Sequence, residues 1–137
     1  MVSVPAETRT HVDAVVALLR QSGLTVYVAD PPRVPHDAVP FVVVWPDAGT
    51  VSAGSVGDHL SDLFVDFQTT SVGATAEQAL WVHDKAARVL WGARPSVEGR
   101  YTLPIFAPES PQPVRRDDDL AVPLMFVAAR WRLHTTP

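Results

Sequence analysis

The sequence contains no cysteine, and its 137 residues include one lysine, Lys85, against ten arginines. The absence of cysteine excludes disulfides, thiolate metal sites and a cysteine nucleophile. Long apolar runs are also missing: the longest, 39–45, has seven residues counting Pro40, whereas a membrane-spanning helix needs about 20. The first residues, 1–5, lack both the basic region and the apolar core of a signal peptide. We therefore expect a protein that is made and used without export and does not bind a membrane.

The composition that remains is typical of a folded chain. Hydrophobic residues make up 47% of the sequence and charged residues 19%, which distinguishes it from a disordered segment. The length suits one domain covering 1–137, because domains commonly have about 100–150 residues. The formal net charge of −4 argues against a nucleic-acid binder held by phosphate contacts.

The first half of the chain predicts one helix followed by strands. Apolar residues recur at helical spacing over 6–22, in a stripe of Val12, Val15, Val16 and Leu19. Strands are expected at 24–29 and 41–45, joined by a proline-rich connection at 30–35. The strand at 41–45 is apolar on both faces, so we expect both faces to be covered.

A glycine- and serine-containing loop at 46–59 separates this part from a third strand. Loops of that length are usually functional or mobile, and we expect this one to project from the body. The third strand, at 60–70, alternates between an apolar face and a polar face that carries Asp62 and Asp66. The apolar face consists of Leu63, Val65, Phe67 and Thr69.

Thr75 and Gln78 have the spacing of a capping box and predict the start of a second helix, which ends near Gly92. Its expected core stripe consists of Ala76, Ala79, Leu80, His83, Ala86, Ala87 and Leu90. A proline-containing stretch at 94–111 is expected to be irregular and to project.

Two strands are expected at the C-terminal end, a short one at 113–119 and a long one at 121–134. The element order is then α-β-β-β-α-β-β. This order predicts an α+β fold, a mainly antiparallel sheet with two helices packed on one face.

No set of residues with the chemistry of a catalytic centre emerges from these elements. Gly49 and Gly54 have the glycine spacing of a phosphate-binding loop, but the lysine that follows in such loops is absent. His59 lies near Asp58, Asp62 and Asp66, yet the last two lie about 13 Å apart on an extended strand and do not readily converge on one ion. We expect no metal, no cofactor and no enzymatic activity. An enzyme or ligand-binding domain would need a pocket around these residues, or around His36 and Asp37.

Charged and aromatic residues on outward faces point instead to protein contacts. On the second helix a tryptophan lies among charges opposite the core stripe, which is typical of a partner surface. The alternative is that Trp81 lies under the stretch 94–111. The acidic run at 117–119 is expected in a solvated turn, and two arginines face outward on the last strand. The interface candidates are Trp81, Lys85, Arg88, Arg115, Arg116, Asp117, Asp118, Asp119, Arg130 and Arg132.

Two segments resemble tail terminator proteins of long-tailed phages of actinobacteria. One is the strand-to-helix passage at 67–73, with Thr75, Gln78, Ala79 and Asp84 after it. The other is the stretch 113–119, followed by Pro123 and an apolar strand, which is similar to the family's C-terminal hairpin. The element order also fits over most of the chain. The motifs are short, and none is a catalytic signature.

The resemblance implies a structural role in a virion assembled in the host cytoplasm. Members of the family form a ring of six copies on the last ring of the tail tube, which ends tube growth and offers a surface to the head connector. DNA passes through the lumen, and an acidic protein would not retain it. The family has no fixed motif for ring formation, so no interface residue is carried over by identity.

Our assignment of surfaces to partners is a hypothesis. The loops at 46–59 and 94–111 would contact the tail tube or the connector, and the outer face of the second helix would contact the neighbouring copy. The stretch 115–119 would supply paired charges between subunits. The acidic residues expected at the lumen or a partner loop are Asp47, Asp58, Asp62 and Asp66. A head–tail stopper, another neck protein or a minor tail protein would fit the same pattern.

Overall fold

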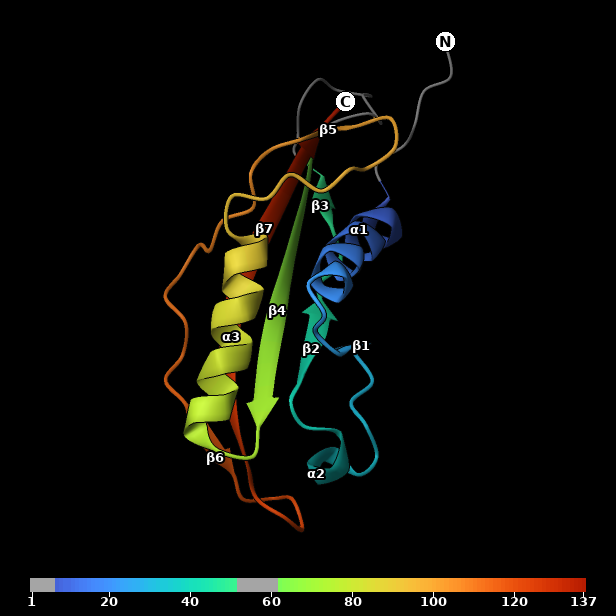
Figure 1. The fold of residues 1–137 in the computed structure, drawn as a ribbon. Coiled ribbons are helices and arrows are strands. Elements are labelled where there is room, and N and C mark those ends of the chain that lie inside the picture. Colours follow the sequence, from blue (N-terminus) through green and yellow to red (C-terminus); the bar gives the residue numbers. More distant parts are fainter. Residues whose placement is uncertain (1–6, 52–61) are drawn as a thin grey trace.

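The computed structural model describes residues 7–51 and 62–137, and Figure 1 shows a long twisted sheet with helices on one face. The helices are α1 (Thr8–Gln21), α2 (Pro35–Ala38) and α3 (Ala76–Leu90). The strands are β1 (Val26–Val28), β2 (Phe41–Pro46), β3 (Thr50–Val51), β4 (Leu63–Gly73), β5 (Tyr101–Thr102), β6 (Arg115–Asp117) and β7 (Leu124–Thr136).

The predicted order and fold class are confirmed. Helices α1 and α3 and strands β1, β2, β4, β6 and β7 follow one another as expected, in an α+β fold. Three short elements, α2, β3 and β5, were not predicted from the sequence. None of the helices described is long and apolar enough to cross a membrane.

The sheet is built around its two longest strands. Its strand order is β1-β2-β4-β7-β5, with β3 paired to β4 and β6 paired to β7. Every pairing is antiparallel except that between β1 and β2. Strands β4 and β7 stay in register along the whole of β4, with Phe67 opposite Trp131 and Asp66 opposite Arg132.

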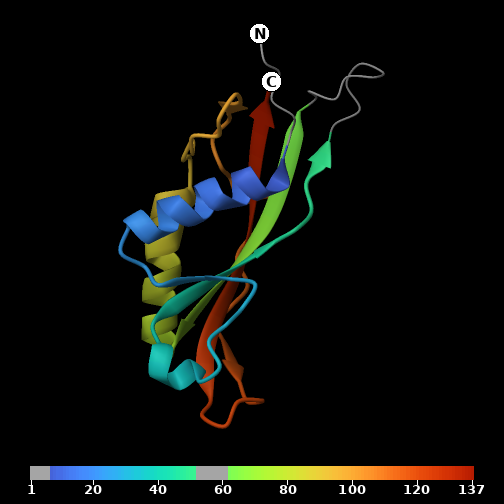
Figure 2. The ribbon, with the colours of Figure 1, turned by 90° about the vertical axis from the view of Figure 1, so that its right-hand side faces the viewer.

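The main core lies between the sheet and the two long helices. Figure 2 shows α1 crossing the sheet and α3 running beside it. The alternation expected on β4 is confirmed, since every second residue from Leu63 to Thr69 is buried against the helices. Fully buried side chains of this core include Val15, Leu19, Val44, Phe67, Val82, Leu90, Trp131 and Leu133.

Helix α3 begins as the sequence predicts. The Thr75 side chain accepts a hydrogen bond from the Gln78 amide at 3.1 Å, and the Gln78 side chain accepts one from the Ala74 amide at 2.7 Å. The expected core stripe was wrong in part, because Leu80 is 44% exposed and Val82 is fully buried. Ala79, Ala86 and Leu90 fit either stripe, and the packing of α3 on β4, β7 and α1 determines which neighbouring residues are buried.

The stretch 94–111 lies along the sheet instead of projecting freely. Ile105 is buried, and its amide donates to the Ala93 carbonyl while its own carbonyl accepts from Gly92. Leu103 donates to the His134 carbonyl and Phe106 pairs with Arg132, so the stretch extends the sheet beyond β7. Of the other expected loop, 46–59, the structure describes only 46–51, where β3 pairs with β4.

Gly73, the last residue of β4, lies close against the first turn of α3. A β-carbon there would lie 2.5 Å from the backbone nitrogen of Ala79. We expect Gly73→Ala to lower the free energy of unfolding by about 1–3 kcal/mol, because backbone must shift to admit the methyl group. Gly92→Ala is the control: its β-carbon meets nothing within 4 Å, although its φ of +76° costs an alanine about 1 kcal/mol. Chemical denaturation that ranks Gly92→Ala as the more damaging change would contradict this.

Candidate functional site

The face of the sheet that carries no helix is the most distinctive surface in the described part of the chain. Because side chains alternate along a strand, β4 presents Phe64, Asp66 and Gln68 on this face. Directly opposite them on β7 lie His134, Arg132 and Arg130. Opposed residues on neighbouring antiparallel strands have β-carbons about 4.5–5.5 Å apart, so these side chains can interact in pairs.

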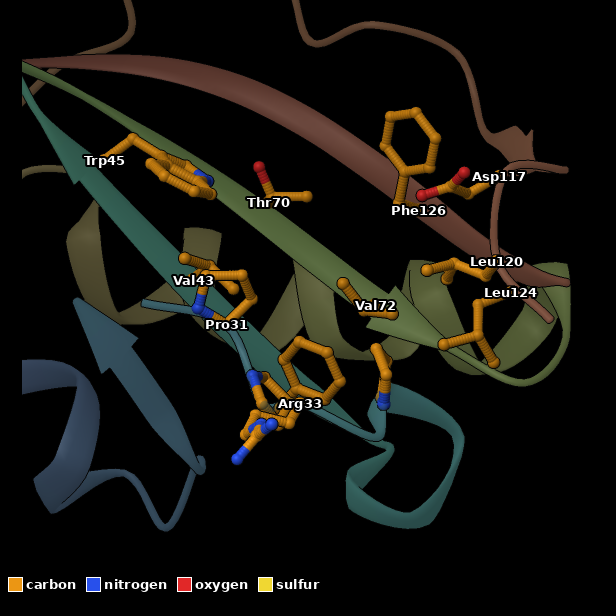
Figure 3. Close-up of a pocket in the computed structure, with 13 residues that line it drawn as sticks. Pro31, Arg33, Val43, Trp45, Thr70, Val72, Asp117, Leu120, Leu124 and Phe126 are labelled. Atoms are coloured by element: carbon orange, nitrogen blue, oxygen red, sulfur yellow. The ribbon is translucent and has the colours of Figure 1, made fainter. Parts of the chain in front are cut away.

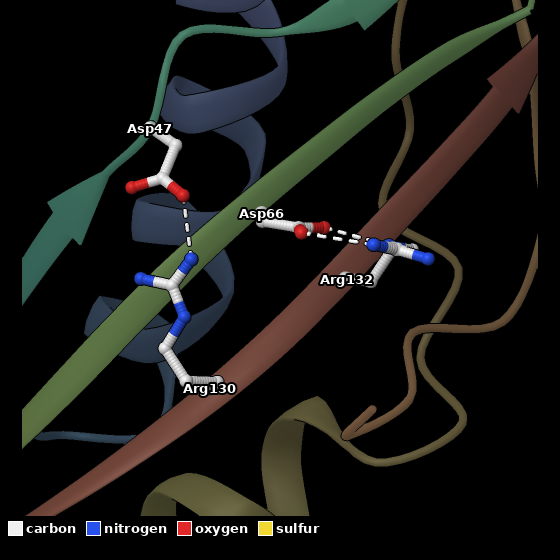
Figure 4. Close-up of polar contacts among 4 residues, drawn as sticks. All are labelled: Asp47, Asp66, Arg130 and Arg132. Atoms are coloured by element: carbon white, nitrogen blue, oxygen red, sulfur yellow. Dashed lines mark hydrogen bonds and ion pairs between the residues drawn. The ribbon is translucent and has the colours of Figure 1, made fainter. Parts of the chain in front are cut away.

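Asp66 and Arg132 form a two-pronged ion pair across the strands (Figure 4). Arg132 Nε donates to one carboxylate oxygen at 2.7 Å and Nη2 donates to the other at 3.0 Å. The hydrogen bond from Arg132 lowers the pKa of Asp66 and raises that of Arg132, against opposing effects of burial. Both side chains are partly exposed, at 28% and 38%, so the contribution to stability is modest.

Arg130 does not pair with Gln68, the residue opposite it, but reaches across β4 to Asp47 (Figure 4). Its hydrogen bond to the Asp47 carboxylate raises the pKa of the guanidinium. The Asp47 amide in turn donates to the Asp66 carbonyl at 2.9 Å. The chain immediately after β2 is thereby fixed beside β4.

A third pair extends this row towards the end of the sheet. His134 Nε2 lies 2.9 Å from an Asp62 carboxylate oxygen, and its ring stacks on Phe64 with centroids 4.2 Å apart. The Arg132 guanidinium lies 5.7 Å from the Phe64 centroid. We name this set the charge row; it consists of Asp47, Asp62, Asp66, Arg130, Arg132 and His134.

Two of the acidic residues that the sequence offers as possible metal ligands lie in the charge row. Asp62 and Asp66 are each engaged by a side chain of β7, His134 and Arg132 respectively. Asp58 and His59 lie outside the described residues. In the described ranges no group of three or more His, Asp or Glu side chains is arranged to hold a metal ion. His36 and Asp37, the other suggested pocket residues, lie 3.3 Å apart on the short, exposed α2.

Below the charge row the same face is apolar and hollowed. A groove of about 370 Å³ lies between the proline-rich segment at 31–35 and the β6–β7 hairpin. Its floor includes Phe41, Val43 and Val72, which belong to a second small core. The expectation that β2 is covered on both faces is thus confirmed for 41–44, whereas Trp45 is 37% exposed. Sequence reasoning did not identify this groove, although a strand with two apolar faces was its signal.

On the opposite side of the molecule, α3 presents the interface candidates of the second helix. Trp81 is 52% exposed and does not lie under 94–111. The Lys85 ammonium lies 5.0 Å from the Trp81 ring centroid, a cation–π contact. Arg88 is exposed one turn further on.

The β6–β7 hairpin keeps part of its charge within the chain. Arg116 Nε lies 2.6 Å from an Asp118 oxygen, and the Asp119 amide donates to the Asp117 carboxylate at 3.1 Å. The acidic turn expected at 117–119 is therefore present. Arg115 lies within 3.4 Å of the Gln112 side chain. Pairing of these charges between subunits stays a prediction.

One buried polar cluster has no counterpart in the sequence-based expectations. His11 is fully buried on α1, where its Nδ1 lies 2.6 Å from the Glu7 carbonyl and its Nε2 lies 2.6 Å from the Thr135 hydroxyl. Because a carbonyl only accepts, Nδ1 carries the proton and Nε2 accepts from Thr135. The Thr135 hydroxyl itself accepts from Arg100 Nε at 3.1 Å, so the cluster joins α1 to the end of β7.

We expect stability to fall with pH below the ordinary histidine pKa of 6.5. Burial lowers the pKa of His11, although its hydrogen bond to the Glu7 carbonyl acts to raise it. Burial also lowers the pKa of His83, although the charge of Asp84 acts to raise it. The unfolded chain then takes up protons that the folded chain does not, so stability is complete above pH 6.5 and is lost as pH falls towards the lowered values. The hydrogen bond from Arg132 lowers the pKa of Asp66 below its ordinary value of 3.8. A second loss of stability is therefore expected as the pH falls below 3.8. A melting temperature that is constant or rises between pH 7 and 5 would contradict the first step.

Comparison with known proteins gives likenesses among solved structures. No protein-family model and no curated protein sequence matches the chain. Among solved structures, a chain of the "Virion of native gene transfer agent (GTA) particle" superposes with a TM-score of 0.62. The match covers 90% of this chain and 84% of that chain at 16% sequence identity. At that identity the likeness shows that this chain shares its fold with a protein of that particle.

Proposed function

We propose that the protein is a structural component of a phage-like virion, and that about six copies form a ring that ends the tail tube. The observation that carries the proposal is the fold, which matches a chain of a gene transfer agent virion over 90% of this sequence. The resemblance to tail terminator proteins also supports it, because it depends on the short motifs at 67–73 and 113–119 as well as on the order of the elements.

In this proposal the ring binds the last ring of the tail tube on one side and the head connector on the other. The protein acts by its surfaces and not by catalysis. DNA passes through the lumen during ejection, and the net charge of −4 per copy favours its passage. Within the charge row, Asp47 and Asp66 are paired with arginines and Asp62 is paired with His134. The acidic Asp58 and the carboxylates of 117–119 are therefore left as candidates for the lumen or a partner.

A second candidate is a head–tail stopper or another neck protein. The matching structure is a whole virion, and its description specifies no position for the matching chain. The likeness therefore fits both candidates equally and does not distinguish them. Both place the protein in the virion at the junction of tail and head.

Growth of tail tubes in vitro separates these candidates. Tube protein from the same phage is polymerised with and without the chain, and negative-stain electron microscopy records tube lengths and end structures. The proposal predicts shorter tubes with a ring at one end. A stopper would leave tube lengths unchanged and bind purified portal rings. Binding to neither assembly would contradict a place at the head–tail junction.

A further inference from the structure

The apolar groove on the helix-free face has the character of a binding surface. Figure 3 shows its residues arranged around an open centre, between the proline-rich segment and the β6–β7 hairpin. Apolar side chains dominate its lining, and several of them are partly exposed although they are large. The partly or fully exposed apolar members include Pro31, Trp45, Leu120 and Phe126.

Two opposite charges flank this apolar lining. Arg33 belongs to the proline-rich segment and is exposed, whereas Asp117 ends β6. In Figure 3 these two residues lie on opposite sides of the groove. An occupant that carries an apolar centre, an acidic group at one end and a basic group at the other would satisfy both charges.

The outer face of α3 carries that pattern. Glu77, Trp81 and Lys85 follow one another at intervals of four residues, which places them in one row on a helix. The row is about 12 Å long from its acidic to its basic end, at 1.5 Å per residue. Trp81 at its centre is 52% exposed and Leu80 beside it is 44% exposed.

We propose that the groove of one copy receives the outer face of α3 from a second copy, with Trp81 over the apolar floor, Glu77 beside Arg33 and Lys85 beside Asp117. The groove lies on the helix-free face of the sheet and α3 lies on the other (Figure 2), so each copy has both a donor and an acceptor surface. Such a head-to-tail contact repeats from copy to copy and closes into a ring when the rotation between copies allows it. The choice of a second copy as occupant rests on the ring proposed above.

A charge exchange tests the pairing of Glu77 with Arg33. Each single reversal, Glu77→Arg or Arg33→Glu, places like charges together and is expected to weaken self-association about tenfold or more, as measured by sedimentation velocity over a concentration series. The double variant restores opposite charges and is expected to recover most of the wild-type association. Both positions are exposed, so far-UV circular dichroism should be unchanged. Additive losses in the double variant would overturn the pairing.

Mixing two damaged chains tests whether the contact is head-to-tail. Trp81→Lys removes the helix surface and Trp45→Lys removes the groove edge, so each variant alone is expected to be monomeric. A 1:1 mixture retains one intact pair of surfaces and should give a heterodimer of twice 14.9 kDa, about 30 kDa, with nothing larger. Tyr101→Lys, at a residue that is 79% exposed and outside both surfaces, is the matched control and should assemble normally.

The outcomes separate this contact from the proposed function. Rings that persist in the Trp81→Lys and Trp45→Lys variants would overturn the contact and leave the ring proposal intact. A wild-type chain that stays monomeric throughout would overturn both.

Discussion

Trp131→Ala is expected to lower the free energy of unfolding by about 3–5 kcal/mol, and the melting temperature by about 10–20 °C. Trp131 lies at the centre of β7 in the main core and is 2% exposed. Removing the indole leaves a large cavity between the sheet and α3. It also leaves the buried Thr69 hydroxyl without the indole N–H that donates to it at 3.0 Å.

Two variants identify the sources of this loss. Trp131→Phe retains most of the ring and removes the hydrogen bond, so its cost should be well below that of the alanine. Trp91→Ala is the matched control, because Trp91 contacts Trp131 edge-on at 6.2 Å but is 61% exposed. Its expected cost is below about 1.5 kcal/mol. Equal losses at the two tryptophans, in urea unfolding, would contradict the burial assigned to Trp131.

Reversing both arginines of the β6 strand, by Arg115→Glu and Arg116→Glu, is expected to abolish or strongly weaken ring formation while the monomer stays folded. The stretch 115–119 would then carry five consecutive acidic residues beside the groove that Asp117 lines. The existing Arg116–Asp118 pair is 60% and 71% exposed, so its loss costs the fold little. The large effect on assembly follows from the hypothesis that Arg115 and Arg116 pair with acidic groups of the neighbouring copy, because like charges brought together at an interface cost several kcal/mol.

The same change in net charge elsewhere provides the control. Arg9→Glu and Arg94→Glu together alter two exposed arginines outside the hairpin and the groove. Sedimentation velocity of the two double variants should show assembly in the control and monomers in the hairpin variant. Unchanged assembly of the hairpin variant would remove the claim that 115–119 lies at the contact between subunits.

The helices and long strands were predictable because each has a local signal. Thr75 and Gln78 mark the start of α3, and period-two alternation assigned the faces of β4 and β7 correctly. The partner of a residue depends on strand register, which alternation alone does not determine. The sequence therefore places Asp66 and Arg132 on outward faces of their strands but does not predict that they pair. It also does not predict that Arg130 reaches across β4 to Asp47.

Features that depend on distant packing were missed. Leu80 and Val82 lie on opposite sides of the apolar stripe of α3, and the packing of α3 on β4, β7 and α1 selects which of them is buried. The stretch 94–111 contains scattered apolar residues, Ile105 among them, but no periodicity indicates that its backbone pairs with β7. The groove lies between the segment at 31–35 and the β6–β7 hairpin, which are about 80 residues apart in the chain, so it depends on how distant segments pack on the sheet.

Native mass spectrometry over a concentration series, with and without magnesium, is the most direct test of the central claim that copies of this chain form a ring. The account predicts a closed species of six times 14.9 kDa, about 89 kDa, which grows with concentration at the expense of the monomer. A single species of 14.9 kDa at every concentration, in both conditions, would contradict it.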